Sequence, residues 1–258
     1  MDITKHVKNI NEQGYTLVEN VLSPADLKKI QIRFEELIEQ YHSDFDSSLI
    51  PEHEMGVIRC MVNRGNCFEK LFYVEDVMAI NKAILGDCIL YSMNGFYTSK
   101  KFKHPASIFH TDIPIWTDVV LRINNFYLID DVTSENGATW VVPGSHLLPD
   151  RPSDDFINKH KIQVNGKAGS VLIMQSKLYH AAGINYTDSH RKCIGDVMQR
   201  SFIKPQFNWQ KIIPTETAAR LDEKTKRLFD FYTSPPNSVE EYNREGIRRR
   251  EENKAKGY

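Results

Sequence analysis

The sequence lacks a long apolar run, a secretory signal and an excess of charge of either sign, and each absence excludes a class of protein. No stretch approaches the ~20 apolar residues that a membrane-spanning helix needs, and the polar start MDITKHVKNINEQ has no signal-peptide core. The 33 basic and 34 acidic side chains leave a formal net charge of -1, which gives no electrostatic footprint for nucleic acid. We therefore expect a cytoplasmic protein that binds neither membranes nor nucleic acids.

Cysteine is also scarce. The chain has Cys60, Cys67, Cys88 and Cys193, and no two of them show CxxC spacing. This usage is typical of free thiols in a reduced compartment, and it argues against a disulfide framework or a structural zinc site.

Apolar residues make up 41% of the 258-residue chain, enough for a sizeable core. Residues 14–18 predict a short strand, and Ser-Pro-Ala-Asp at 23–26 predicts the start of a helix with serine as its N-cap. We expect irregular chain over 42–67 and a second helix over about 68–85, ended by Gly86. Both helices are expected to pack on the core rather than to carry chemistry.

Short apolar runs, separated by turn sequences such as 135–137 and 143–145, dominate residues 88–203. This texture predicts a mainly β fold with flanking helices, as a sandwich, a barrel or a double-stranded jelly roll. Helix returns in the tail, where the mixed charges of 241–258 are typical of a solvated helix. Since no Pro/Gly/Ser-rich linker divides the chain, we expect one domain over 1–258.

The stretch FHTDIPIW, residues 109–116, places a histidine and an aspartate two apart in an apolar run. If this stretch is a strand, His110 and Asp112 point to one face and Thr111 to the other. An imidazole and a carboxylate are two ligands for a divalent transition metal, and a second histidine would complete the set found in non-haem Fe(II) oxygenases.

His180 is the best candidate for the third ligand, because it follows an apolar strand that starts from a glycine turn at 169. Arg191 lies eleven residues further on, at the entry to the next predicted strand. Oxygenases of this type chelate 2-oxoglutarate on iron, and its far carboxylate needs a fixed cation, for which the planar fork of arginine is well suited. Two alternatives stay open at this point: a merely structural His/Asp pair, and zinc in place of iron.

Together these segments resemble the phytanoyl-CoA dioxygenase family of Fe(II)/2-oxoglutarate-dependent oxygenases. The resemblance covers roughly residues 14–205 and is carried by GYTLVENVLSPADLKKI, the His-Thr-Asp motif, DDVTSENGATWVVPGSH and GSVLIMQSKLYHAAGINYTDSHRK. It implies a double-stranded β-helix, cupin-like, with a helical C-terminal extension over about 206–258. It further implies Fe(II), 2-oxoglutarate and O2 as cofactors.

The resemblance also implies roles for single residues: His110, Asp112 and His180 as metal ligands, and Arg191 as the 2-oxoglutarate anchor. Halogenating relatives replace the carboxylate ligand with glycine or alanine, so Asp112 favours hydroxylation or a related oxidation. Ala182 departs from members that have serine at that position.

Three further positions carry expectations from the same resemblance. Thr111 stands where some members have glutamine between the ligands. We expect Asn185 to shape a turn and His146 to be structural.

The expected function is hydroxylation of an unactivated C–H bond in a small metabolite or natural-product intermediate, with release of succinate and CO2. Desaturation, ring closure or epimerisation with the same cofactors stays open, and so does a non-catalytic or zinc-bound cupin-like binding protein. The expected partner is a small-molecule substrate, and the sequence does not fix an oligomeric state.

Candidates for the substrate pocket flank the metal motif on three predicted strands. Asn94 is a further candidate for contact with 2-oxoglutarate. Trp116 is the first choice, because it lies four residues from Asp112, and an inward-facing Arg200 would indicate an anionic substrate. Core packing is the rival role for each aromatic residue. The full set of pocket candidates is Trp116, Phe96, Tyr97, Gln199 and Arg200.

Overall fold

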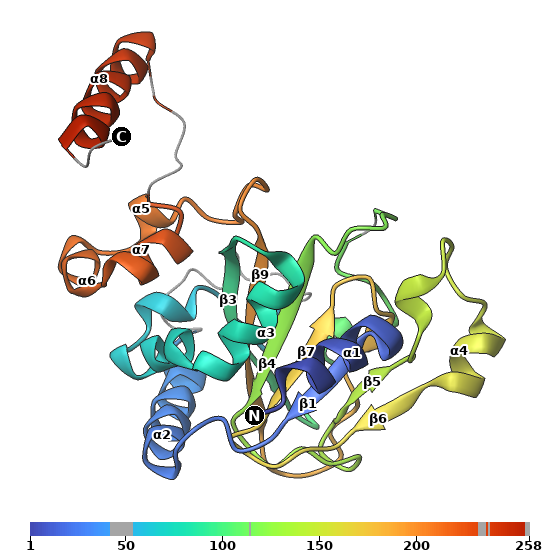
Figure 1. Cartoon of the computed structure of the whole chain (residues 1–258). Coiled ribbons are helices and arrows are strands. Elements are labelled where there is room, and N and C mark those ends of the chain that lie inside the picture. Colours follow the sequence, from blue (N-terminus) through green and yellow to red (C-terminus); the bar gives the residue numbers. More distant parts are fainter. Residues whose placement is uncertain (42–53, 114, 232–235, 237, 256–258) are drawn as a thin grey trace.

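The computed structural model describes residues 1–41, 54–113, 115–231, 236 and 238–255. The irregular chain predicted for 42–67 therefore lies partly outside the described residues. Within the described part, two antiparallel sheets form the centre of the molecule and helices flank them (Figure 1). The predicted mainly β fold, a double-stranded β-helix with flanking helices, is confirmed.

The larger sheet has six strands in the order β1-β7-β4-β9-β3-β2, and the smaller has three in the order β6-β5-β8. Every neighbouring pair is antiparallel. The strands of the larger sheet are β1 (Tyr15–Val18), β2 (Val57–Ile58), β3 (Cys88–Thr98), β4 (Arg122–Leu128), β7 (Val171–Gln175) and β9 (Arg191–Arg200). Those of the smaller sheet are β5 (Thr139–Val141), β6 (Ile162–Val164) and β8 (His180–Ala181).

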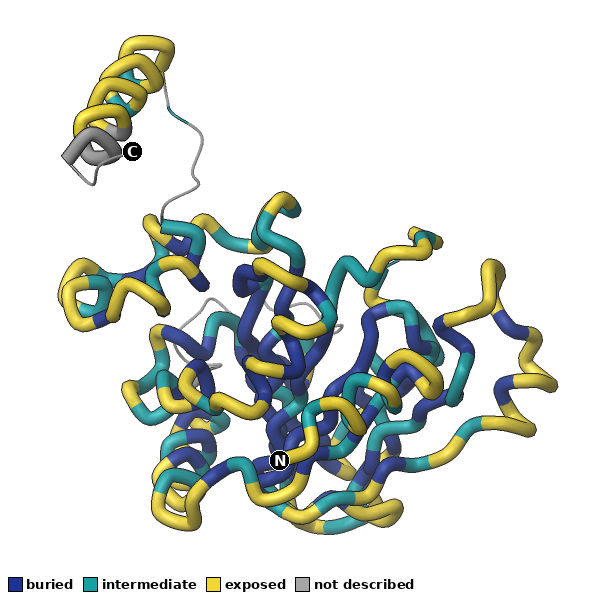
Figure 2. Tube along the Cα trace, viewed as in Figure 1, coloured by how far each residue is buried: buried dark blue, intermediate teal, exposed yellow. Residues whose placement is uncertain are grey.

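Helices α1 (Ile3–Gln13), α2 (Pro24–Tyr41) and α3 (Glu75–Leu85) pack on the larger sheet and build the main core with it. Figure 2 shows the buried chain concentrated in the strands, whereas these helices have exposed outer faces. In α2, Ile30, Phe34 and Leu37 recur at helical spacing and are fully or almost fully buried. Burial of this stripe explains why α2 lies where it does.

The N-terminus of α2 confirms the predicted cap. The Asp26 amide donates to Ser23 Oγ at 3.1 Å, and Ser23 Oγ donates to the Asp26 carboxylate at 2.8 Å. The helix predicted over 68–85 is instead two elements, the 3-10 helix η4 (Asn66–Tyr73) and α3. Val74 separates them with an extended backbone, at ψ 92°.

The condition that 109–116 forms a strand is not met in its described residues, 109–113 and 115–116. Of the described residues in this stretch, only His110 pairs, in an isolated bridge with His180. The Asp112 amide donates instead to the Ser176 carbonyl at 3.0 Å. The segment therefore turns from the edge of β8 to the end of β7 within three residues. A single straight strand cannot satisfy both partners.

The side chains of β4 alternate between two faces, and only one of these faces is turned toward the functional site. Ile123 and Tyr127 point into the helix-covered core, so Arg122, Asn124 and Phe126 point to the opposite face.

The remaining elements are shorter or peripheral. The described residues after β9 are largely helical, and Figure 1 draws α8 apart from the sheets. No helix in the described part of the chain is long and apolar enough to cross a membrane. A single domain over 1–258 stays a prediction. The shorter or peripheral elements are η3 (Met61–Asn63), η5 (Pro105–Ser107), η6 (Ser145–Leu147), α4 (Asp154–His160), α5 (Trp209–Ile212), α6 (Thr215–Arg220), α7 (Glu223–Leu228) and α8 (Val239–Ala255).

Candidate metal centre

Two segments that are distant in sequence bring three side chains together between the two sheets. His110, Asp112 and His180 each offer a ligand atom, and these atoms all lie within 4.8 Å of one another. The Asp112 carboxylate oxygens lie 3.8 Å from His110 Nε2 and 3.7 Å from His180 Nε2. Two imidazoles and one carboxylate at this separation match the facial arrangement that binds iron and leaves other positions open.

Both histidines are held in the tautomer that a metal requires. His110 Nδ1 donates to the Ile108 carbonyl at 2.7 Å, and His180 Nδ1 donates to the Leu178 carbonyl at 2.9 Å. The Nε2 lone pair of each ring is therefore free to point at the cluster. Burial, and then the neighbouring His180, lower the pKa of His110, which keeps its ring neutral at pH 7.

The carboxylate ligand is oriented by its own support. Asn124 Nδ2 donates a hydrogen bond to Asp112 Oδ2, and Ser176 Oγ donates to Asn124 Oδ1 at 3.2 Å. Asn124 and Ser176 are almost completely buried, so the bond between them is shielded from water. Outer partners of this kind fix the direction of a metal ligand.

A cavity of about 110 Å³ opens from the three ligands into the space between the sheets. Its walls are mainly apolar, and its charged wall residue away from the ligands is Arg191. Burial, and then the charge of Arg191, lower the pKa of His104 to about 4, so this wall residue is neutral at pH 7. The lining comprises Phe96, Thr98, His104, Ala106, His110, Asp112, Phe126, Thr139, His180, Ala182, Arg191 and Cys193.

Arg191 is 4% exposed and only partly satisfied. Its Nη2 donates to the Gly137 carbonyl at 2.7 Å and its Nη1 to Cys193 Sγ at 3.3 Å. Its buried Nε has no partner among the residues that the structure describes. A buried guanidinium without a carboxylate partner is costly unless an anion completes it. An arginine and three metal ligands in one apolar cavity fit a chelating dicarboxylate such as 2-oxoglutarate.

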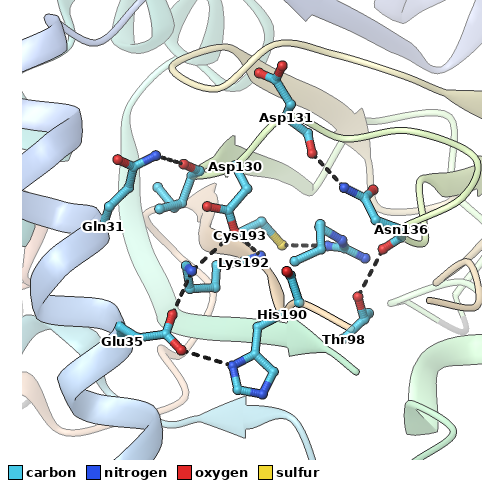
Figure 3. A network of polar contacts seen from close by, with 12 residues as sticks. Gln31, Glu35, Thr98, Asp130, Asp131, Asn136, His190, Lys192 and Cys193 are labelled. Atoms are coloured by element: carbon cyan, nitrogen blue, oxygen red, sulfur yellow. Dashed lines mark hydrogen bonds and ion pairs between the residues drawn. The ribbon is translucent and has the colours of Figure 1, made fainter. Parts of the chain in front are cut away.

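The residues on either side of Arg191 fasten this part of β9 to α2. Figure 3 shows Lys192 between Glu35 and Asp130, and His190 against the other oxygen of Glu35. The Lys192–Glu35 and His190–Glu35 distances are 2.7 Å and 3.0 Å. Burial alone would raise the pKa of Glu35, but these bonds lower it. The alternation of the strand then directs Arg191 to the cavity side.

Of the other predicted pocket residues, Phe96 lines the cavity. Tyr97 points to the other face of β3, where its ring packs at 5.6 Å from Phe102 and at 5.2 Å from His190. Asn94 is not among the lining residues, and its Oδ1 accepts from the Cys60 amide at 3.2 Å.

Trp116 is half exposed and lines a neighbouring cavity of about 300 Å³ together with Thr111. Gln199 and Arg200 lie at the end of β9, away from the lining of the ligand cavity. Arg200 donates to the Val120 carbonyl at 2.8 Å, so it does not face inward. Roles for these residues in substrate binding stay predictions.

The remaining expectations concern structural residues. Asn185 shapes its turn as expected, since its amide donates to the Thr98 and Ser189 carbonyls. His146 is fully buried and bonded to the Asn11 carbonyl at 3.0 Å, which is a structural position.

Sequence reasoning missed Asn124 and Phe126. A signal for them exists in RINNFYL, where two asparagines interrupt an apolar strand. A buried asparagine in such a place needs a hydrogen-bond partner, and one of the two partners is a metal ligand.

The phytanoyl-CoA dioxygenase family model matches residues 10–193 of the chain. An uncharacterised protein of Mycobacterium tuberculosis is 29% identical over 241 residues, which cover 90% of this chain and 88% of that protein. Dioxygenase sphC of Aspergillus fumigatus is 25% identical over 259 residues, which cover 91% of this chain and 68% of that protein.

Solved structures agree at the level of the fold. EctD from S. alaskensis with bound Fe has a TM-score of 0.65 at 20% identity, over 78% of this chain and 79% of EctD. The α-ketoglutarate-dependent epimerase SnoN has a TM-score of 0.62 at 19% identity, over 77% of this chain and 81% of SnoN. The carbocyclase SnoK has a TM-score of 0.61 at 21% identity, over 76% and 83%.

Proposed function

The chain belongs to the phytanoyl-CoA dioxygenase family of oxygenases that use iron and 2-oxoglutarate, and from this premise we propose that it hydroxylates an unactivated C–H bond of a small metabolite or natural-product intermediate. The observation that carries the proposal is the convergence of His110, Asp112 and His180 beside a cavity that contains Arg191. A metal-ligand set and a buried cation in one cavity are what a chelating dicarboxylate requires.

In this proposal the two histidines and Asp112 hold the iron, and Asn124 keeps the carboxylate aimed at it. Arg191 binds the far carboxylate of 2-oxoglutarate, and its unpartnered Nε supplies a donor for that bond. When bound, iron and 2-oxoglutarate activate dioxygen and oxidise the substrate, with release of succinate and CO2.

The other cavity residues exclude water and exclude one class of chemistry. Phe96 and Phe126 pack at 5.7 Å between ring centroids and form an apolar wall, which keeps water from the reacting atoms. Asp112 occupies the position that a halide would need on the metal, which supports oxidation over halogenation.

Ring closure and epimerisation are the second candidate. Among proteins of the same fold, SnoK is a carbocyclase and SnoN an epimerase, so the fold accommodates outcomes other than hydroxylation. The placement of the substrate relative to the metal decides among them. The relatives also support a small-molecule substrate, since SnoN has been crystallised with nogalamycin RO and EctD with 5-hydroxyectoine.

The test starts without a substrate. Anaerobic addition of Fe(II) and 2-oxoglutarate should produce a weak visible charge-transfer band, and oxygen should then yield succinate. A properly metallated protein that gives neither contradicts the proposal and favours the zinc-bound or non-catalytic binding protein.

Turnover of 2-oxoglutarate over a metabolite library then identifies the reaction by mass. Gain of one oxygen atom supports hydroxylation, whereas loss of two hydrogens indicates desaturation or ring closure. A product of unchanged mass and altered retention indicates epimerisation.

A further inference from the structure

Phe126, Asn124 and Arg122 share the face of β4 that is turned away from the helix-covered core. Phe126 lines the cavity that contains Arg191, and Asn124 contacts the ligand Asp112. Arg122 follows on the same face, two residues and about 7 Å further along the strand. If 2-oxoglutarate lies between the metal and Arg191, the metal's other side, toward Arg122, is left for the substrate.

Arg122 is fixed in place rather than free in solvent. Its Nη2 donates to Gln199 Oε1 at 3.0 Å, and Gln199 Nε2 in turn donates to the Ile203 carbonyl at 2.7 Å. Its guanidinium carbon lies 3.6 Å from the centre of the Tyr91 ring. Stacking on an aromatic ring and a hydrogen bond to a buried amide fix the orientation of the guanidinium, so that binding an anion costs little further side-chain entropy.

This held charge has no carboxylate partner of its own. Among the described residues, no acidic side chain lies within ion-pair distance of Arg122, and its buried Nε has no hydrogen-bond acceptor. Asp112 is the carboxylate that influences Arg122 electrostatically, but its oxygens point at the metal position and at Asn124. The negative charge of Asp112 is thus used by the metal.

The formal charges of the filled site sharpen the argument. A divalent iron and Arg191 together balance Asp112 and the dianion of 2-oxoglutarate, and the two histidines are neutral. Arg122 then leaves one positive charge on the substrate side, in a partly buried position where an unpaired charge is costly. A single negative charge on the substrate removes the imbalance.

We propose that Arg122, held by Tyr91 and Gln199, binds a carboxylate of the substrate and thereby selects a monoanionic acid. This inference rests on the proposed function, because it assumes that 2-oxoglutarate occupies the Arg191 side. The sequence suggested that an inward-facing Arg200 would indicate an anionic substrate. Arg200 instead donates to backbone carbonyls, and Arg122 is the arginine that takes this role in the proposal.

The two buried Nε–H groups allow a test that needs no known substrate. The probe pair is benzoate and benzamide, which share a skeleton and differ in charge. Zinc, a diamagnetic substitute for iron, and saturating 2-oxoglutarate are added to the full chain labelled with 15N. Nitrogen–proton spectra then follow the Nε–H signals of Arg122 and Arg191, which R122Q and R191Q identify by the loss of one signal each.

We expect 2-oxoglutarate to shift the Arg191 signal and benzoate to shift the Arg122 signal in a saturable way. Benzamide should bind at least about tenfold more weakly, because it lacks the charge that a guanidinium recognises. R200Q is the matched control: it removes an arginine from the end of the neighbouring strand and should leave the benzoate response intact.

The outcomes separate the two proposals. An Arg191 signal that does not respond to 2-oxoglutarate contradicts the proposed function. An Arg191 signal that responds, beside an Arg122 signal that ignores benzoate or responds equally to benzamide, overturns the carboxylate site alone.

Discussion

Asn124 and Asn125 are neighbours in sequence with the same side chain, yet they serve opposite faces of β4. Each donates a hydrogen bond to an aspartate, Asn124 to Asp112 and Asn125 to Asp196. Asp112 is partly exposed at the metal position, whereas Asp196 is fully buried against the helix-covered core. Burial raises the pKa of Asp196 to about 7.

The difference shows that the surroundings of an Asn–Asp pair, rather than the pair itself, decide its role. Asp112 has two imidazoles within 4 Å, so its negative charge would help to bind a metal held by all three side chains. Burial raises the pKa of Asp196, and the hydrogen bond from the Asn125 amide, which lowers it, does not offset this effect. One face of β4 therefore supports the candidate metal site, whereas the other buries a carboxylate whose ionised form is destabilised by the core.

The comparison is tested most severely by D112A. Removal of a metal ligand should lower iron affinity by more than the roughly 100-fold that loss of an outer partner costs, and it should abolish succinate formation. Iron content after dialysis and a 2-oxoglutarate turnover assay measure both. D196A is the matched control on the other face, and it should retain iron. Iron binding that survives D112A would refute the ligand assignment.

R191Q should have the next largest effect. Removal of a buried guanidinium that pairs with a carboxylate of the ligand costs about 2–5 kcal/mol of binding free energy. The dissociation constant of 2-oxoglutarate should therefore rise by about 30-fold or more. Anaerobic titration of the charge-transfer band measures it, with iron affinity as the internal control. R191K, which keeps the charge but not the fork, should fall between. Unchanged affinity for 2-oxoglutarate in R191Q would assign the anchor to another residue.

The sequence was most informative where chemistry constrains residue type and spacing. The sequence motifs single out His110, Asp112, His180 and Arg191, and the structure brings these four residues into one cavity. The described part of 109–116 does not run as one strand, because the segment divides its backbone bonds between β8 and the end of β7. The motif thus identified three residues that converge, although their described neighbours do not form a strand.

The sequence was least informative about direction. Whether Tyr97 or Phe96 faces the cavity, and whether Arg122 or Arg200 is the inward cation, depends on strand register. A shift of one residue reverses every side chain of a strand. The register of β3 and β4 against β9 is set by long-range pairing that no local pattern contains. Asn124 was missed for the same reason.

D196N should stabilise the protein at alkaline pH by roughly 2 kcal/mol, because it removes a buried charge and keeps an acceptor for Asn125. The folded-state pKa is raised from 3.8 to about 7, so wild-type stability is greatest below the unfolded pKa and is lost as pH rises toward the folded one. Denaturant midpoints of wild type and variant should coincide near pH 4 and diverge up to pH 8. Parallel curves over that range would contradict the raised pKa.

The smallest effect comes from the asparagines themselves, and it separates the two faces most cleanly. N124A frees the Asp112 carboxylate to rotate and should weaken iron binding by about tenfold, the lower end of what loss of an outer partner costs. N125A removes an equal side chain one residue away, but it should leave iron affinity unchanged and instead destabilise the fold, since buried Asp196 loses its partner. Iron titration and denaturant unfolding of both variants form a double comparison. If both variants weaken iron alike, the effect of N124A is a general loosening of β4, and Asn124 has no specific role in aiming the ligand.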